Sequence, residues 1–247
     1  MNERHNSILR ILGQEGHTSV STLSRMLKVS AVTIRQDLNT LEAEGLLKRV
    51  HGGAVLREAD DLSDRLGINY EQKLAIARRV ASCVTEGETI LIESGSVNAL
   101  LARELVKEKK VTIITTNVFI ARQFRKEEKA GIILLGGIYQ HHSESLVGRI
   151  TRTCLDQLNI GKAFIGIDGY TSSTGFTSRD LLRAEISAYI VRKARDVYVV
   201  SDSSKFGREE LSTICYPGDI RHLATDSNLE PAYLEEFRKA GIELILA

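Results

Sequence analysis

Residues 20–55 read VSTLSRMLKVSAVTIRQDLNTLEAEGLLKRVHGGAV, and this stretch decides the fold of the amino-terminal part of the chain. Apolar residues at helical spacing on either side of Lys28-Val29-Ser30 predict two helices joined by a short turn, the second over 31–44. The Ser30 hydroxyl can accept a backbone N–H that the first turn of this helix leaves without a partner, and Gly45 is expected to end the helix. The run LLKRVHGGAVL then predicts a β-hairpin that turns at Gly52-Gly53.

A further helix is expected upstream, over 3–13, because the apolar residues between Ile8 and Leu12 form a stripe at helical spacing. Three short helices and a hairpin within about 55 residues are the outline of a winged helix-turn-helix. We therefore predict such a domain over 1–57. A polar linker without a clean helical or strand period is expected over 58–72.

Beyond residue 72 the pattern changes to short strands that alternate with helices. The strands are continuous runs rich in Ile and Val, which are typical of a sheet covered by helices on both faces. We therefore predict that 73–247 form an α/β domain with a mostly parallel sheet. Strands are expected over 89–92, 111–116, 131–137, 162–169, 196–202 and the last residues before 247, and helices over 73–84, 96–107, 117–127, 150–158 and 179–193.

The composition is that of an ordinary folded protein. Of the 247 residues, 43% are hydrophobic and 26% are charged, and two are prolines. No apolar run approaches the roughly 18 residues that a membrane span needs. Because the amino-terminal residues are also too charged for a signal peptide, we expect a cytoplasmic protein with no membrane partner.

The cysteines and histidines do not form a metal-binding pattern. Cys83, Cys154 and Cys215 lie far apart, which argues against disulfides and against a structural zinc site. His141 and His142 are adjacent, so their side chains point apart, and no third ligand has suitable spacing. We expect these histidines in a surface loop, and we expect neither a metal nor a cofactor.

Charge is distributed unevenly along the chain, although the total is only +1. Residues 1–57 contain eight Lys or Arg and five Asp or Glu, a net charge of +3, which leaves −2 for residues 58–247. A weakly basic amino-terminal domain is compatible with nucleic-acid binding at that end. This difference in net charge is too small to establish nucleic-acid binding.

The outward face of the helix over 31–44 carries short amide and hydroxyl side chains and few charges. Such groups can bond base edges in the major groove, and recognition helices contact bases mainly through their N-terminal half. Ser30, Thr33 and Gln36 are therefore expected to read bases, and Arg35 to bind phosphate. The helical period alone does not distinguish this interpretation from its alternative, a three-helix packing module whose polar face is only solvated. The full set of expected DNA-binding residues is Ser30, Thr33, Arg35, Gln36, Asn39, Thr40, Lys48, Arg49 and His51.

Residues 20–55 closely resemble the helix-turn-helix of the DeoR family of bacterial sugar-catabolism regulators. The resemblance implies a DNA-binding regulator, usually a repressor, that binds double-stranded operator DNA as a homo-oligomer, a dimer or a tetramer. Gln36 departs from the family, which commonly has a second arginine there, so an operator sequence cannot be carried over from relatives. The matching residues are Ser30, Thr33-Ile34-Arg35, Asp37-Leu38, Leu41, Gly45 and His51-Gly52-Gly53-Ala54.

Polar and glycine-rich residues follow the predicted strands of the larger domain. In open α/β sheets ligands bind beyond the carboxyl ends of the strands, where these residues fall. Glycine lets a ligand approach the backbone, and free N–H groups at a helix N-terminus favour an anion such as phosphate. Each residue could instead be structural, since glycines permit tight turns and Asp202 can cap a helix. The expected effector-binding residues are Ser94, Gly95, Ser96, Thr115, Thr116, Asn117, Gly136, Gly137, Asp168, Gly169, Glu185, Asp202 and Lys205.

The larger domain resembles the effector domain of the same family, which is similar in fold to ribose-5-phosphate isomerase. The resemblance implies a small phosphorylated sugar as the effector. The alternative is a sugar-phosphate isomerase with an appended DNA-binding module, in which Glu185, Asp168 and Lys205 supply a base and an electrophile. The isomerase has a lysine followed by glycines in the stretch that matches 172–175, which here is Ser-Ser-Thr-Gly. We therefore expect a binding site without catalysis.

Overall fold

The computed structural model describes residues 3–43, 46–55, 62–127 and 129–247. The chain divides into two compact units, Met1–Glu71 and Gln72–Ala247. In the described ranges, no helix has both the length and the apolar character needed to cross a membrane. The predicted helix end at Glu44 and Gly45, and the predicted domain boundary at residue 57, lie outside the described residues.

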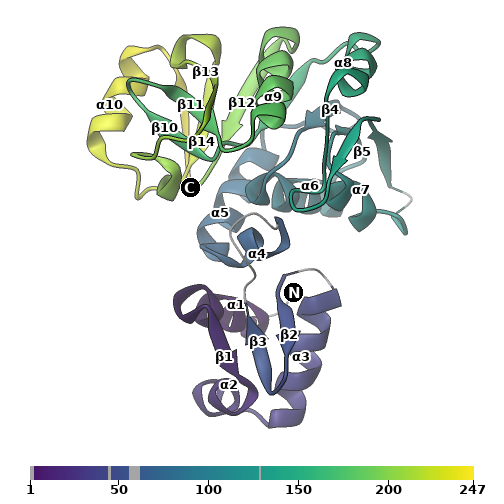
Figure 1. The fold of residues 1–247 in the computed structure, drawn as a ribbon, viewed down its shortest axis with the longest axis vertical. Helices are drawn as coiled ribbons and strands as arrows, with labels where there is room; N and C mark the ends of the chain where they lie inside the picture. Colours follow the sequence, from purple (N-terminus) through teal and green to yellow (C-terminus); the bar gives the residue numbers. More distant parts are fainter. Residues whose placement is uncertain (1–2, 44–45, 56–61, 128) are drawn as a thin grey trace. The chain divides into compact units, whose positions relative to one another are not determined.

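The first unit contains a winged helix-turn-helix, as the sequence predicts. Helices α1 (Glu3–Glu15), α2 (Val20–Leu27) and α3 (Ala31–Ala43) accompany an antiparallel sheet in which β3 (Gly53–Val55) lies between β1 (His17–Ser19) and β2 (Lys48–Val50) (Figure 1). The helices bury apolar side chains of high volume, which supply most of the stabilisation. The fully buried members are Ile8, Leu9, Leu12, Leu23, Ile34, Leu38 and Leu41.

Side-chain caps set the starts of both helices of the helix-turn-helix. Ser19 Oγ accepts the Thr22 N–H at 3.1 Å, and Ser30 Oγ accepts the Thr33 N–H at 3.1 Å, so the predicted cap at Ser30 is confirmed. Lys28 ends α2 with a left-handed φ of 53°. The turn between α2 and α3 is thus defined at each end by local hydrogen bonds.

The hairpin turn needs its two glycines for different reasons. Gly52 has a φ of +78°, and a Cβ built there would meet nothing within 4 Å. Gly53 pairs with Ser19 of β1, and a Cβ on Gly53 would lie 2.4 Å from the Thr18 carbonyl oxygen. The sequence analysis did not predict β1, because a three-residue strand gives too short a period to recognise.

The predicted linker over 58–72 is not irregular throughout. It contains α4 (Leu62–Gly67) and the first residues of α5 (Tyr70–Ala81). Leu66 and Tyr70 are buried, which explains why this polar stretch still forms helices: a few apolar anchors are sufficient when they pack. Its first residues, through 61, lie outside the described part of the chain.

The second unit is built on a seven-stranded parallel sheet, as predicted. The strands are β4 (Thr89–Ile92), β5 (Val111–Thr115), β6 (Ala130–Leu134), β9 (Lys162–Ile165), β12 (Asp196–Val200), β14 (His222–Thr225) and β15 (Glu243–Leu246). Their order is β15-β14-β12-β9-β4-β5-β6. The chain therefore winds from the central β4–β9 pair towards both edges, and the direction of winding reverses between these two strands.

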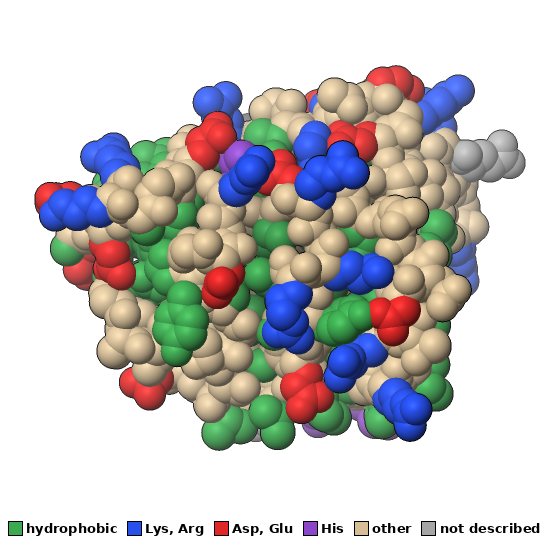
Figure 2. Space-filling view, turned by 90° about the horizontal axis from the view of Figure 1, so that it is seen from above, with side chains coloured by type: hydrophobic (Ala, Val, Ile, Leu, Met, Phe, Trp, Pro, Cys, Tyr) green, Lys and Arg blue, Asp and Glu red, His purple; other side chains and the backbone are tan. Residues whose placement is uncertain are grey.

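Helices cover both faces of this sheet, which accounts for its continuous apolar strands. Figure 1 shows α5, α6 (Ser96–Glu108) and α7 (Val118–Gln123) on one side and α8 (Arg149–Asp156) and α9 (Leu181–Lys193) on the other. Helix α10 (Pro231–Lys239) precedes the edge strand β15. Over the face drawn in Figure 2, basic, acidic and apolar side chains are interspersed, in keeping with the near-zero total charge.

Several short strands were not predicted. A hairpin of β7 (Ile138–Gln140) and β8 (Ser145–Val147) follows β6. A small antiparallel sheet contains β10 (Gly169–Thr171), β11 (Gly175–Ser178) and β13 (Ser212–Cys215), and β14 was also missed. The predicted strands over 131–137 and 162–169 end earlier, at Leu134 and Ile165.

Candidate functional site

The exposed side of α3 carries side chains that the sequence predicts to contact DNA. Arg35, Gln36, Asn39 and Thr40 are exposed. Ser30 is engaged in capping, and its hydroxyl also lies 2.8 Å from Thr33 Oγ1. Of the three predicted base readers, Gln36 is therefore the one whose side chain is exposed and not used in the cap, and the exposed Arg35 precedes it in the sequence.

Asp37 faces the interior and fixes α3 to α1. Its carboxylate accepts bonds from Arg4 Nε at 2.6 Å and Arg4 Nη2 at 3.0 Å, and His5 Nε2 lies 3.0 Å from it. Burial acts to raise the pKa of Asp37, but the bonds from Arg4 and His5 outweigh it and hold that pKa below its usual value. The orientation of α3 thus depends on a partly buried charge pair with a residue far away in the sequence.

Arg49 joins the hairpin to α3. Its Nη1 donates to Asn39 Oδ1 at 2.6 Å, and its backbone N–H donates to Glu42 Oε1 at 2.8 Å. The sequence predicts that Arg49 and Asn39 both contact DNA, and the structure pairs them with each other. Lys48 and His51 of the hairpin are exposed.

In the second unit, the residues predicted to bind the effector gather at the carboxyl edge of four neighbouring strands. Ser94 follows β4, Asn117 follows β5, Asp168 follows β9 and Asp202 follows β12, and all four side chains are buried. The reversal of winding lies between β4 and β9. This is the position at which open α/β sheets bind ligands, so the prediction that these strand ends converge is confirmed by the topology.

The N-terminus of α6 lies at this edge. Gly95 precedes the helix with a φ of 117°, and no side chain caps the first turn. The Asn98 amide donates to the carbonyls of Ser94 at 2.8 Å and Phe164 at 3.2 Å, which ties the end of β4 to β9. The backbone N–H groups at this helix start have no side-chain cap, and Ser96 adds a hydroxyl group, so the position favours an anion.

A hydroxyl and amide network connects β4, β5 and the β7–β8 hairpin. Ser145 Oγ donates to Ser94 Oγ at 3.1 Å, while Asn117 Nδ2 donates to the Ser143 carbonyl at 2.8 Å and approaches Ser94 Oγ at 3.3 Å. Asn117 Oδ1 also accepts the Ile120 N–H at 3.0 Å and caps α7. The hairpin is therefore fixed over the ends of two strands.

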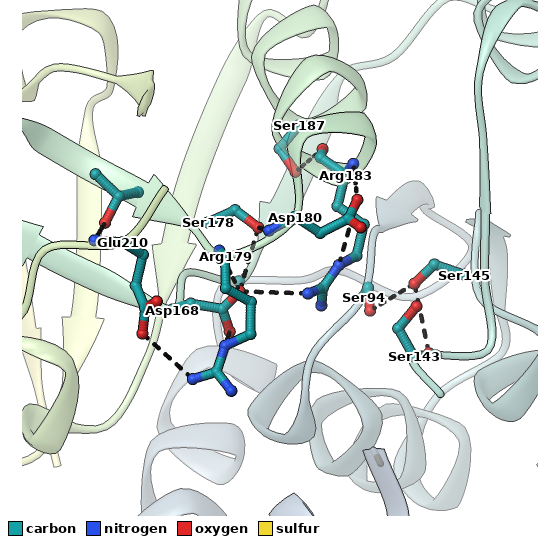
Figure 3. Close-up of polar contacts among 12 residues, drawn as sticks. Ser94, Ser143, Ser145, Asp168, Ser178, Arg179, Asp180, Arg183, Ser187 and Glu210 are labelled. Carbon is teal, nitrogen blue, oxygen red and sulfur yellow. Dashed lines mark hydrogen bonds and ion pairs between the residues drawn. The ribbon is translucent and has the colours of Figure 1, made fainter. Parts of the chain in front are cut away.

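Two arginines at the start of α9 flank Asp168 (Figure 3). Arg183 Nη2 lies 3.6 Å from Asp168 Oδ2, and Arg179 Nε lies 3.9 Å from Asp168 Oδ1. Arg183 is 8% exposed, and Asp180 caps α9 beside it by accepting the Arg183 N–H at 2.8 Å. Gln140 of β7 donates to Asp180 at 2.9 Å, so this charged cluster also contacts the hairpin.

Glu93, one residue before Ser94, is buried at the sheet edge and keeps its proton to a higher pH than an exposed carboxyl group does. Burial raises the pKa of Glu93 to about 7. Ser187 Oγ lies 3.2 Å from Glu93 Oε1 and 3.0 Å from the Arg183 carbonyl, and the Gly166 N–H donates to Glu93 Oε2 at 3.3 Å. If the Ser187 hydroxyl donates to the Arg183 carbonyl, a protonated Glu93 can donate to the Ser187 oxygen. Glu93, Ser187 and the Arg183 carbonyl then each have a hydrogen-bond partner.

Lys73 of α5 reaches the end of β12. Its Nζ lies 3.9 Å from Asp202 Oδ2, and both residues are 3% exposed. A lysine this deeply buried is rare unless it is paired or used. Asp202 also caps the turn at Ser203–Lys205 by accepting the Ser204 N–H at 3.2 Å, so the predicted effector residues Asp202 and Lys205 belong to one short segment.

The remaining predicted effector residues divide into two groups. Five of them have structural roles. Thr115 Oγ1 donates to the Glu93 carbonyl, the Leu146 N–H donates to the Thr116 carbonyl, and Thr151 Oγ1 donates to the Gly136 carbonyl. A Cβ on Gly137 would overlap Thr151 Oγ1, and a Cβ on Gly169 would overlap the Arg208 carbonyl. Glu185 is exposed on α9, two residues from each of the buried Arg183 and Ser187. It therefore projects from another side of the helix and is not brought to the cluster.

The sequence analysis missed Lys73, Glu93, Ser145, Arg179 and Arg183. For Glu93 and Arg179 a signal was available, since each adjoins a quoted strand-end motif. Lys73 and Arg183 stand inside helical patterns, where a charged residue is ordinarily exposed. His141 and His142 are exposed, and among the residues that the structure describes, no group of three His, Cys, Asp or Glu side chains is arranged to hold a metal ion.

A winged helix-turn-helix with an exposed polar helix, followed by an α/β domain with polar strand ends, is the domain organisation of ligand-responsive transcription regulators. The family model described as the DeoR-like helix-turn-helix domain matches residues 4–60, and the model described as the DeoR C terminal sensor domain matches residues 68–227. The chain belongs to the DeoR family of transcriptional regulators.

Curated relatives match over nearly their whole length. The transcriptional regulator GolR of Listeria innocua is 31% identical, over 99% of this chain and 98% of the relative. The glycerol-3-phosphate regulon repressor of Escherichia coli K12 is 32% identical, over 85% of this chain and 84% of the relative. Among solved structures, ribose 5-phosphate isomerase A of Methanocaldococcus jannaschii matches 56% of this chain and 55% of that chain with 21% identity and a TM-score of 0.40, a partial likeness.

Proposed function

We propose that this regulator represses a carbohydrate-utilisation operon and that a phosphorylated sugar bound at the carboxyl edge of the β4–β9 region controls it. The observation that carries the proposal is the convergence of four strand ends with two buried cations. Ser94 and Asp168 flank the reversal of winding, and Lys73 and Arg183 bring positive charge to the same edge. Buried cations and an uncapped helix start suit an anionic ligand.

The two ends of a phosphorylated sugar match different parts of this edge. The phosphate is expected at the start of α6, where Ser94 and Ser96 supply hydroxyl groups and the backbone supplies N–H groups. The sugar hydroxyls are expected to donate to the carboxylates of Asp168 and Asp202. The printed name of one relative, the glycerol-3-phosphate regulon repressor, includes a phosphorylated compound, which supports this class of ligand.

An isomerase is the weaker alternative. It would require a carboxylate base close to Asp168 and Lys205, and Glu185, the residue predicted for that role, is exposed on another side of α9. Asp168 itself accepts Ser178 Oγ and the Arg179 N–H, both at 3.2 Å, and lies beside two guanidinium groups, so its carboxylate is already engaged in contacts within the protein. We therefore propose a sensor without catalysis.

Operator DNA is expected to contact α3 and the hairpin. One recognition helix reads one half-site, so we propose that the protein acts as a dimer or tetramer on paired half-sites in the cytoplasm, where its operator lies. The sugar phosphate then changes operator affinity only to the extent that it binds the two arrangements differently.

The effector proposal is tested by thermal-shift measurements on the full chain with glycerol 3-phosphate, fructose 1-phosphate and glucose 6-phosphate, with inorganic phosphate as a reference. A binding sugar phosphate present at about 100 times its Kd should stabilise the chain by about 2.7 kcal/mol and should also change its affinity for a duplex selected from a random library. Stabilisation by none of the sugar phosphates, or by inorganic phosphate equally, would contradict the proposal.

Lys205→Ala is expected to keep operator affinity and to lose the response to the sugar phosphate. Removal of a charged hydrogen-bond partner of the ligand costs on the order of 2 kcal/mol, which corresponds to a roughly thirtyfold higher effector concentration for the same response. Lys239→Ala, which removes an exposed lysine paired only at the surface with Glu235, is the control and should respond normally. A normal response in Lys205→Ala would remove Lys205 from the site.

Arg35→Ala and Gln36→Ala are expected to weaken DNA binding in different ways. Loss of a phosphate contact at Arg35 should weaken binding to all duplexes and reduce the salt slope by about 1, whereas loss of Gln36 should cost about 1–3 kcal/mol only with the preferred base at one position. Gel-shift titrations against the selected duplex and its single-base variants, at several salt concentrations, separate the two. If both variants bind like the wild type, the assignment of this face is wrong.

A further inference from the structure

Arg183 is a buried cation whose hydrogen-bonding capacity is not fully used within the protein. The residue is 8% exposed, and its Nε is buried without a hydrogen-bond partner among the residues that the structure describes. Asp168 Oδ2 lies 3.6 Å from Nη2 and Asp180 Oδ1 lies 4.0 Å from Nε, so both carboxylates are within ion-pair distance but beyond hydrogen-bond distance. Because a buried donor without an acceptor lowers stability, this arrangement favours an acceptor that comes from outside the chain.

Helix α9 places Arg183 between the ends of β4 and β9, which are adjacent strands of the sheet. One turn further along the helix, Ser187 Oγ lies 3.2 Å from Glu93 Oε1, and Glu93 directly precedes Ser94 at the end of β4. On the other side, the Arg183 guanidinium faces Asp168, which follows β9. Figure 3 shows this guanidinium between Asp168 and Ser94. Its N–H groups therefore face the edge at which α6 begins.

The two lysines of this edge belong to a more distant strand. Lys73 and Lys205 lie at the end of β12, which is two strands away from β4 in the sheet. Neighbouring strands are about 4.8 Å apart, so the ends of β12 and β4 are separated by roughly 10 Å. Arg183 is at the adjoining strand β9, and it is therefore better placed than either lysine to neutralise an anion at the start of α6.

The chemistry of a guanidinium group suits a phosphate in this position. Its planar fork can donate two parallel hydrogen bonds to two oxygens of one phosphate. The backbone N–H groups at the uncapped start of α6 can donate to the same phosphate from another direction. Asp168 is itself held by Ser178 Oγ and the Arg179 N–H, both at 3.2 Å, so it can fix the position of the Arg183 side chain without occupying its donors.

We propose that Arg183 binds the phosphate group of the effector directly, opposite the start of α6, and is the residue that selects a phosphate ester over an uncharged sugar. This inference rests on the proposed function, since it requires a sugar phosphate at this edge. Lys205 and Asp202, at the end of β12, then face the sugar end of the ligand.

The test compares a sugar phosphate with inorganic phosphate in the full chain. Arg183→Met keeps an aliphatic side chain and removes the charge and the N–H donors. Calorimetry gives the Kd of fructose 1-phosphate, or of the panel member that stabilises the wild-type chain most, and competition gives the inhibition constant of inorganic phosphate. We expect both constants to rise by the same factor, roughly tenfold to hundredfold, because both ligands lose the same charge-assisted hydrogen bonds.

Arg192→Met is the matched control for this test. Arg192 is an exposed arginine on the same helix, so its loss changes the net charge equally and should leave both constants at their wild-type values. An unchanged Kd for the sugar phosphate in Arg183→Met would overturn the proposal. A higher Kd with unchanged competition by inorganic phosphate would also overturn it, because Arg183 would then contact the sugar or support the fold.

Arg183→Lys keeps the test decisive if Arg183→Met does not fold. The ammonium group retains the buried charge but cannot bind a phosphate through a planar fork, so we expect both constants to rise equally and by a smaller factor. Wild-type constants in a folded Arg183→Lys chain would contradict the proposal, as would a wild-type chain whose sugar phosphate is not displaced by inorganic phosphate. A wild-type chain that binds no member of the panel would instead contradict the proposed function.

Discussion

Replacing Glu93 by Gln is expected to stabilise the sensor unit at pH 8 by up to about 3 kcal/mol and to have little effect at pH 4.5. Burial raises the pKa of Glu93 from 4.5 to about 7, and each unit of difference from the unfolded value corresponds to about 1.36 kcal/mol. Gln reproduces the neutral acid: its amide NH2 can donate to Ser187 Oγ, and its oxygen can accept the Gly166 N–H. The variant is therefore free of the cost of a buried negative charge.

The direction of the pH dependence follows from the raised pKa. Below about pH 4.5 Glu93 is protonated in both the folded and the unfolded chain, and its full contribution to stability is present. As pH rises from 4.5 to about 7, only the folded state still binds the proton, so the wild-type chain loses stability that Glu93→Gln keeps. Above pH 7 the difference between them should be constant.

Urea unfolding of both chains at pH 4.5, 6 and 8 measures this difference directly. Glu104→Gln is the matched control: Lys107 and Arg78 lower the pKa of Glu104, so its loss should destabilise the chain at pH 8 and matter less in acid, the opposite sign. An advantage of Glu93→Gln that is the same at all three pH values would show that Glu93 is not a buried neutral acid.

Gly53→Ala is expected to disrupt the winged domain, whereas Gly52→Asn is expected to be tolerated. A Cβ at Gly53 would lie 2.4 Å from a backbone oxygen of Thr18, and backbone cannot rotate away as a side chain can. Overpacking of this kind costs about 1–3 kcal/mol or more. Because β1 and β3 must separate to admit the methyl group, the hairpin should shift relative to α3 and operator affinity should fall.

Hydrogen exchange of the β1 and β3 amides, together with gel-shift titration, tests the glycine prediction. Gly52 has a left-handed φ of +78° with open space around it, a conformation that Asn adopts more readily than other side chains, so Gly52→Asn is the control for any change in the turn. Equal exchange and equal DNA affinity in the two variants would show that β1 does not constrain Gly53.

The exposed face of α3, which we propose binds DNA, could be predicted from the sequence because its signals are local. Ser30 caps a helix that starts at the next residue, and the exposed side of α3 follows from the spacing of Ile34, Leu38 and Leu41. The ion pair between Asp37 and Arg4 could not be predicted in this way, since Arg4 lies 33 residues away and nothing in a helical period identifies a partner at that separation. The hydrogen bond between Arg49 and Asn39 could not be predicted for the same reason, since it joins the hairpin to α3.

At the proposed effector site, the sequence indicates the strand-end residues and not those on the helices. Strand ends are marked by glycine, serine and aspartate after an apolar run, which is why the sequence points to Ser94, Asp168 and Asp202. In α9, apolar and polar residues are buried on several sides, so its period does not reveal which side faces the sheet edge. Glu185 was therefore placed at the site and Arg183 was not, although Ser187 on the same side as Arg183 lies beside Glu93.

The reversal of strand order at the centre of the sheet also bears on how the protein folds. Ile90 of β4 pairs with Lys162 of β9, a parallel pairing that closes a loop of some seventy residues and is entropically slow to form. Ser94 and Asp168 depend on that pairing, so a nascent or partly refolded chain holds only one side of the proposed ligand site. On the proposed function, sugar phosphate stabilises only chains whose central pairing is complete, and its protection against proteolysis should then report the formation of the β4–β9 pair.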